Sequence, residues 1–126
     1  MAAGPKHGRV LLVEDNEDNL TILADYLTFK GYAVEAARNG REAVECASAD
    51  PPDVILMDIQ MPEMNGLEAI RHLRTMTATA QTPIIAVTAL VMPGDRERCI
   101  AAGADHYISK PINLSEMLDL LERTTS

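Results

Sequence analysis

The chain has 126 residues, a net charge of −8 at pH 7 and a hydrophobic content of 47%. This length suits a single domain, and its core must be aliphatic because the aromatic residues are three Tyr and one Phe. The acidic balance argues against direct binding of nucleic acid, since a protein that binds nucleic acid needs a basic surface to neutralise phosphates.

The first half of the chain predicts two strand–helix pairs. Residues 10–13 are apolar throughout, which is typical of a parallel strand covered on both faces. A weaker strand is expected at 33–37. Apolar residues recur at helical spacing over 20–27 and over 43–47, with Gly31 after the first helix and a Pro-Pro pair after the second.

The second half predicts three further strands and three further helices. Residues 54–57 and 84–87 form unbroken apolar runs, and a weaker strand is expected at 106–109. Helical spacing follows over 67–73, and an apolar stripe over 114–121 predicts the last helix.

Local signals set the expected ends of the last two helices. We expect the fourth helix to run from about Pro93 to Ala102, with Pro93 in its first turn and Gly103 just past its end. For the last helix, Asn113 is the expected N-cap and Glu116 its capping-box partner.

Alternation of strands and helices predicts an α/β, doubly wound fold with right-handed crossovers. The folded domain is expected to span residues 9–124, after a tail of residues 1–8, with no effector domain. No run approaches the ~18 apolar residues of a membrane span, and no signal-peptide pattern opens the chain. Cys46 and Cys99 form no metal or redox motif. We therefore expect a cytoplasmic location.

Polar residues follow four of the five predicted strands. Glu14 and Asp15 follow the first, Asp58 follows the third, Thr88 ends the fourth and Lys110 follows the fifth. The second strand ends on two alanines and offers no chemistry. Because ligands of an open parallel sheet bind beyond the carboxyl ends of the strands, these five side chains are expected to form one site.

The composition of this site indicates a hard cation and an anion. Three carboxylates repel one another unless a cation or a shared proton intervenes, and oxygen ligands suit Mg²⁺, Mn²⁺ or Ca²⁺. A lysine and a threonine are superfluous for cation storage but suit a phosphoryl group. Asp58 directly follows a fully apolar strand and is the expected nucleophile, and the loop 60–66 could supply a backbone carbonyl to the metal.

Taken together, these motifs resemble the receiver domains of bacterial response regulators, the CheY-like family. The resemblance covers residues 9–123 and rests on four segments, VLLVEDN (10–16), LMDIQMP (56–62), VTA (87–89) and YISKP (107–111). It implies a flavodoxin-like (βα)5 fold with a five-stranded parallel sheet of order 2-1-3-4-5. Glu14 is a departure, since many relatives have Asp at this position.

The resemblance also implies roles for the site residues. Asp58 is expected to accept a phosphoryl group from a phosphohistidine on a histidine kinase or a histidine phosphotransfer protein. Asp15 and Asp58 would bind Mg²⁺ directly together with the backbone carbonyl of Gln60, and Glu14 would bind it through water. Lys110 would pair with the phosphoryl group.

Switching is the second property that the resemblance implies. Thr88 would move toward the phosphoryl group and Tyr107 would rotate inward, which changes how the fourth helix, fifth strand and fifth helix bind a downstream protein. A cis peptide bond is expected before Pro111.

Two other features each have two interpretations. The run 95–98 on the fourth helix is a solvated face or a recognition segment, and Met61 and Met64 either fill gaps or shape a partner contact.

Two placements in the family stay open, and two other functions compete. The chain is similar to stand-alone regulators of the DivK type, and a receiver excised from a hybrid histidine kinase is the alternative. A haloacid-dehalogenase-type phosphatase would need a second acid at Gln60, and multiple turnover would reveal it. A flavin-binding module would need a phosphate loop rich in Gly, Ser and Thr, whereas residues 15–18 are acidic or carry an amide. A yellow colour of the purified protein would reveal a bound flavin.

Overall fold

The computed structural model describes residues 8–61, 65–89 and 93–125. Within these ranges five parallel strands form one sheet of order β2-β1-β3-β4-β5, so the expected order is confirmed. The strands are β1 (Arg9–Val13), β2 (Ala33–Ala37), β3 (Val54–Asp58), β4 (Ile84–Thr88) and β5 (His106–Ser109). The helices are α1 (Glu17–Phe29), α2 (Gly40–Ala49), α3 (Gly66–Thr75), α4 (Asp95–Ala102) and α5 (Leu114–Thr125).

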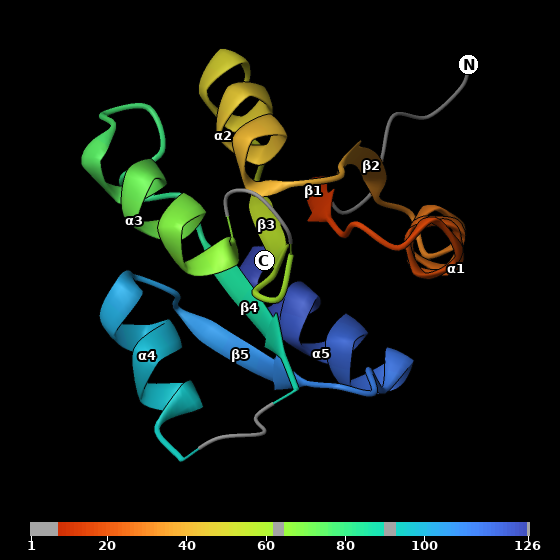
Figure 1. Ribbon diagram of the computed structural model, residues 1–126. Helices are drawn as coiled ribbons and strands as arrows, with labels where there is room; N and C mark the ends of the chain where they lie inside the picture. Colours follow the sequence, from red (N-terminus) through yellow and green to blue (C-terminus); the bar gives the residue numbers. More distant parts are fainter. Residues whose placement is uncertain (1–7, 62–64, 90–92, 126) are drawn as a thin grey trace.

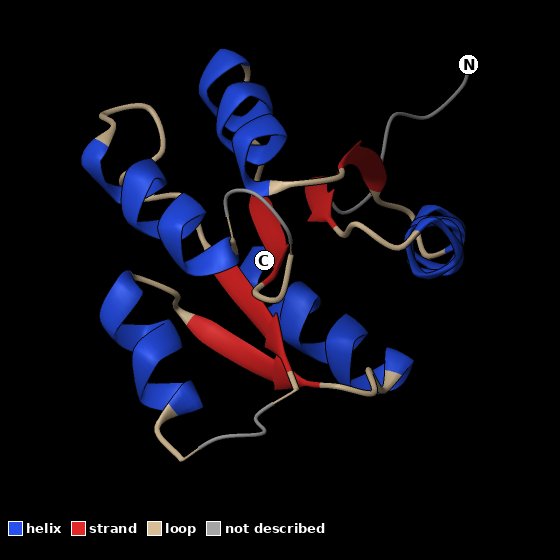
Figure 2. Ribbon diagram, in the orientation of Figure 1, coloured by secondary structure: helices blue, strands red, loops and turns tan. Residues whose placement is uncertain are grey.

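Helices cover both faces of the sheet, as a doubly wound fold requires (Figure 1). α2, α3 and α4 pack on one face, where alternate strand residues such as Ile55 and Met57 join a cluster with Ala69 and Leu73. α1 and α5 pack on the other face over Leu12, Leu56 and Ile85. Figure 2 shows the strands as one layer between the two layers of helices. The fully apolar strands are thus explained, since each central strand has no solvent-exposed face.

Asparagine side chains cap the N-termini of four of the described helices. The Oδ1 atoms of Asn16, Asn39, Asn65 and Asn113 each accept a hydrogen bond, at 2.9–3.1 Å, from the backbone N–H three residues further on. Each bond satisfies one of the N–H groups that the first helical turn leaves without an intrahelical acceptor. The predicted N-cap at Asn113 is therefore confirmed, with Glu116 as its N–H donor.

The start of α4 differs from the prediction. Pro93 lies in a turn, and the helix begins at Asp95 after Gly94, whose φ of +88° is left-handed. A helix cannot contain that backbone conformation, so the left-handed glycine delays its start by two residues. The predicted end is confirmed, because Gly103 follows Ala102 with a φ of +122°.

Arg74 ties α3 to the two turns that flank it at the amino ends of β4 and β5. Its guanidinium donates hydrogen bonds to the carbonyl oxygens of Thr79, Ala80, Thr82 and Gly103 at 2.7–3.2 Å. It also pairs with Asp105, Nη2 to Oδ2 at 2.9 Å, although its side chain is only 20% exposed. One cation therefore satisfies several backbone acceptors that have little access to water.

We predict that Arg74→Met lowers the free energy of unfolding by about 2–4 kcal/mol, because several acceptors and Asp105 lose their donor together. Urea denaturation followed by circular dichroism measures this change. Arg71→Met is the matched control, since Arg71 is exposed on the same helix and its replacement should change stability by less than about 0.5 kcal/mol. Equal stabilities of the two variants would contradict the prediction.

Candidate functional site

The three predicted carboxylates meet where β1 and β3 end. The two strands are parallel neighbours with Val13 paired to Met57, so the residues that come next, Glu14 and Asp58, arrive at the same edge of the sheet. Asp58 is itself the last residue of β3. Asp15 follows Glu14 in the turn before α1. Carboxylate oxygens of Glu14, Asp15 and Asp58 lie within 4.8 Å of one another.

The two oxygens of Asp58 have different surroundings. Oδ1 accepts hydrogen bonds from Lys110 Nζ and from the backbone N–H of Gln60, both at 3.0 Å. Oδ2 is buried and has no hydrogen-bond partner among the residues that the structure describes. A buried carboxylate oxygen without a donor is costly. A cation placed beside Oδ2 would remove this cost.

Burial raises the pKa of Glu14 to about 7. The backbone N–H of Asn16, which donates to Glu14 Oε2 at 3.1 Å, opposes this effect, whereas the neighbouring Asp58 carboxylate raises the pKa further. Glu14 is only 3% exposed and Asp58 only 2%. Two buried carboxylates that lie this close cannot both ionise without a large electrostatic cost. A positive charge beside the pair would lower that cost.

The donor set fits a hard divalent cation. It consists of carboxylate oxygens, and within the described residues no histidine or cysteine joins the cluster. Mg²⁺ binds such oxygens, usually through only a few carboxylates, and keeps several of its waters. Asp15 is exposed while Glu14 and Asp58 are buried, so the cluster is open to solvent on one side, as a partly hydrated ion requires.

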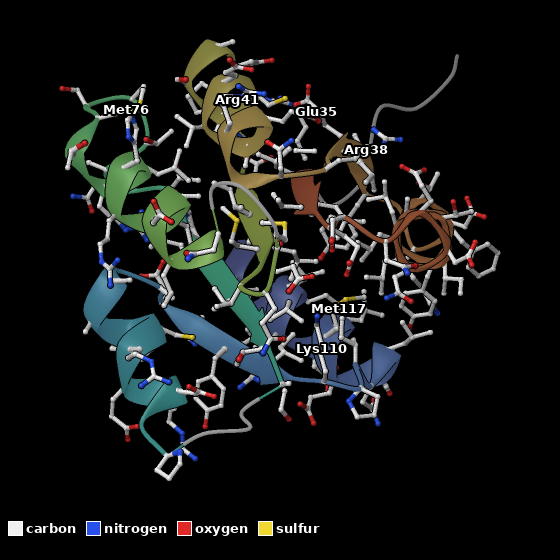
Figure 3. All side chains as sticks on the ribbon, in the orientation of Figure 1. Glu35, Arg38, Arg41, Met76, Lys110 and Met117 are labelled. Atoms are coloured by element: carbon white, nitrogen blue, oxygen red, sulfur yellow. The ribbon has the colours of Figure 1, made fainter. Side chains whose placement is uncertain are left out.

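Lys110 and Thr88 reach the same edge from the adjacent strands. Thr88 ends β4 with 2% exposure, and its carbonyl oxygen accepts the backbone N–H of Lys110 at 2.8 Å. Figure 3 labels Lys110 just beyond β5, on the side where the chain leads into α5. The peptide bond between Lys110 and Pro111 is cis, as expected. The structure thus brings Glu14, Asp15, Asp58, Thr88 and Lys110 to one edge of the sheet.

Tyr107 lies on the same face of the sheet as Thr88. In the β4–β5 pairing Tyr107 is opposite Ala86 and Ser109 is opposite Thr88. Side chains two residues apart in a strand share a face, so Tyr107 and Thr88 are diagonal neighbours on the face that α4 covers. The Tyr107 ring is half-buried against the core cluster of that face.

Two features of this edge, the positions of Arg38 and Gly66, had no signal in the sequence. Arg38 directly follows β2, but its guanidinium pairs with Glu17 in the first turn of α1 and not with the carboxylate cluster. Gly66 allows α3 to begin against β3, since a Cβ there would lie 2.4 Å from the carbonyl oxygen of Asp58. Met61 is buried in the core, so it fills a gap and is not an exposed contact. Met64 lies outside the described residues, as do the other two residues of 62–64.

A groove of about 340 Å³ opens beside Glu14 and Lys110. It runs from Glu14 and Lys110 between α1 and the segment that leads into α5, and apolar residues such as Ile22 and Pro111 line it. Ile22 is 58% exposed. At Glu14, the acidic cluster therefore borders a surface that is partly apolar.

The family model of the response regulator receiver domain matches residues 10–122, which include every residue of this edge. The chain belongs to the response regulator receiver family. This family acts in two-component signalling, generally as a phosphoacceptor switch, so the family predicted from the motifs is confirmed.

Two relatives place this receiver more closely. The polar-differentiation response regulator DivK of Brucella anthropi is 42% identical over 113 residues, which cover 90% of this chain and 92% of DivK. The receiver domain of the sensor histidine kinase PA1611 from Pseudomonas aeruginosa is 38% identical, with a TM-score of 0.88 and 98% of each chain covered. That structure has a magnesium ion coordinated in its active-site cleft.

A third relative was solved with a partner. The co-crystal structure of the Saccharomyces cerevisiae histidine phosphotransfer protein Ypd1 with the receiver domain of its response regulator Ssk1 matches this receiver with a TM-score of 0.86 and 29% identity. The match covers 98% of this chain and 92% of that one.

Within the described residues of the present receiver, helices long and apolar enough to cross a membrane are absent.

Proposed function

We propose that this receiver is a Mg²⁺-dependent phosphorylation switch whose phosphoacceptor is Asp58. One observation carries the proposal. Asp58 is 2% exposed and has one oxygen held by Lys110 and Gln60, while its buried Oδ2 lacks a partner among the described residues. A carboxylate that is fixed on one oxygen and unsatisfied on the other is suited to bind a cation and a phosphorus atom.

Asp15 and Asp58 would hold the Mg²⁺ directly, with the backbone carbonyl of Gln60, and Glu14 would hold it through water. Mn²⁺, which has the same preference for oxygen, would substitute. When bound, the ion would neutralise charge on the phosphoryl oxygens. The carboxylate cluster and the magnesium ion of the PA1611 receiver support this assignment.

In the transfer step, a carboxylate oxygen of Asp58 attacks the phosphorus atom of a donor phosphohistidine. The new O–P bond forms as the P–N bond breaks, and the bonding electrons stay with the donor imidazole, which leaves as a neutral ring after a proton has joined its other nitrogen. Lys110 lies 3.0 Å from Asp58 and would pair with the phosphoryl oxygens, while the Thr88 hydroxyl would donate a hydrogen bond to them.

The product would be stored and not rapidly hydrolysed. Gln60 stands two residues after the acceptor, where a phosphatase with an aspartate nucleophile would need an acid or base. An amide side chain cannot act as a general acid or base at neutral pH. The receiver would therefore catalyse its own phosphorylation and only slow autodephosphorylation.

Thr88 and Tyr107 would transmit the phosphorylation. Their diagonal placement on one face of β4 and β5 means that a shift of Thr88 toward Asp58 opens space beside the Tyr107 ring. The tyrosine would then rotate inward and change the surface of α4, β5 and α5 that binds a downstream protein. Such a shift is a change of population between two conformations.

The phosphodonor would be a histidine kinase or a histidine phosphotransfer protein. The groove beside Glu14 and Lys110 leaves room for an approaching histidine, and the Ypd1–Ssk1 complex supports a donor of this class. The match with DivK over nearly its whole length supports a stand-alone regulator. We place the receiver domain at residues 9–124, in the cytoplasm with its kinases.

Phosphorylation by acetyl phosphate tests the metal requirement. With Mg²⁺ present, we predict incorporation of one phosphoryl group per chain, and with excess EDTA we predict at least a 100-fold lower rate, because like charges then oppose the approach of the phosphoryl group. Intact-protein mass spectrometry measures the incorporation. Equal rates with Mg²⁺ and with EDTA would contradict the role of the metal.

A further inference from the structure

Arg96 and Tyr107 are in contact on the surface between α4 and β5. The Arg96 guanidinium carbon lies 5.0 Å from the centroid of the Tyr107 ring, within the range of a cation–π interaction. Arg96 is exposed and Tyr107 half-buried, so the cation rests on the outer side of the ring. The core cluster that the ring packs against lies on its inner side.

The neighbouring arginine of the same helix turn is engaged elsewhere. Arg98 forms an ion pair with Asp95. Within the described part of the chain, Arg96 instead lies over the Tyr107 ring. Arg96 therefore contributes to the position of Tyr107 more than to the stability of α4.

We propose that Arg96 is a brake on the switch, a positioning residue that stabilises the outward conformation of Tyr107 in the unphosphorylated protein. This inference rests on the proposed function, in which phosphorylation draws Tyr107 inward. Inward rotation carries the ring away from an exposed guanidinium and breaks the contact. By linkage, an interaction that exists only in the unphosphorylated conformation makes attachment of a phosphoryl group, or binding of a phosphoryl mimic, less favourable by up to the same factor.

The size of the brake follows from the strength of an exposed cation–π pair. Such a pair changes an equilibrium by about two- to five-fold, which corresponds to about 0.5–1 kcal/mol. A modest factor of this kind suits a switch, because it resists spontaneous activation without preventing activation by phosphorylation.

Beryllofluoride, which mimics a phosphoryl group on a carboxylate, provides the probe. For the experiment, 3-fluorotyrosine is incorporated at position 107, and the labelled receiver is titrated with beryllofluoride in the presence of Mg²⁺. The ¹⁹F resonance then reports the position of the ring. We expect Arg96→Gln to lower the half-saturating concentration about two- to five-fold and to move the unliganded resonance toward its bound position. Arg96→Lys, which keeps a cation, should give a smaller change.

Arg98→Gln is the matched control, since it removes the same charge from the same helix without touching Tyr107. It should leave both readouts unchanged. An unchanged half-saturating concentration in Arg96→Gln, or an equal change in Arg98→Gln, would overturn the brake while the proposed function stands. A wild-type receiver that binds no beryllofluoride would overturn the proposed function itself, whatever the Arg96 variants do.

Discussion

Asp58→Asn is expected to abolish phosphorylation by acetyl phosphate or phosphoramidate in the presence of Mg²⁺. The amide has no charged oxygen to attack phosphorus, and its NH₂ group is a donor where the site needs an acceptor. The loss should be complete within the sensitivity of mass spectrometry, because covalent attachment requires the nucleophile itself. The measurement is the number of phosphoryl groups per chain after a fixed incubation.

Asp119→Asn is the control for this variant, since Asp119 is an exposed aspartate on α5. It should incorporate one phosphoryl group at the wild-type rate. The fold of Asp58→Asn should persist, because the substitution also removes the like charge that faces Glu14. Stoichiometric labelling of a folded Asp58→Asn protein would refute the assignment of the acceptor.

Lys110→Met is expected to slow phosphorylation by about 100- to 1,000-fold, the usual cost of losing one charged donor at the reacting group. Lys110 Nζ lies 3.0 Å from Asp58 Oδ1, so the variant removes a positive charge that stands directly beside the reacting carboxylate. Single-turnover rates with acetyl phosphate and Mg²⁺ measure the effect.

Binding of Mg²⁺ separates this effect from a damaged metal site. Removing a positive charge beside three carboxylates should leave the affinity for Mg²⁺ unchanged or higher. Lys30→Met, at the end of α1, should change neither property. A normal rate in Lys110→Met, or a loss of Mg²⁺ binding that accounts for the slower rate, would contradict the role given to Lys110.

Most of the sheet was predictable from local patterns. The runs 10–13, 54–57 and 84–87 are apolar at every position because both faces of these strands are covered. The weaker strands at 33–37 and 106–109 also occur at those residues. They are edge strands, partly exposed, which explains their weaker pattern. The order of the strands follows from contacts between distant segments, and it came from the family resemblance and not from the pattern.

The carboxylate cluster was predictable because parallel strands deliver their carboxyl ends to one edge. Knowing that Glu14 follows one strand and Asp58 ends another was enough to place them together. The different surroundings of the two Asp58 oxygens were not predictable, since they depend on the direction of one backbone N–H and one lysine side chain.

Contacts between distant segments could not be predicted from the sequence where no motif marks the residues that make them. In the sequence, Arg74 looks like an ordinary cation at the end of a helix, yet its guanidinium donates hydrogen bonds to carbonyl oxygens in two separate turns. Arg96 lies in a charged run whose residues look equivalent, and only the packing of α4 against β5 sets it over Tyr107. Gly94 has a positive φ, so α4 begins after it. The sequence did not predict this start, because a glycine can adopt a positive φ but need not do so.

Chemical mapping of the phosphorylated residue tests the central claim most directly. An acyl phosphate is reduced by borohydride to an alcohol, so reduction of the phosphorylated protein should convert Asp58 to homoserine. We predict that peptide mass spectrometry finds homoserine at position 58, in protein phosphorylated with Mg²⁺ and not in protein incubated with EDTA. Homoserine at another aspartate, or phosphorylated protein with an unmodified Asp58, would contradict the account.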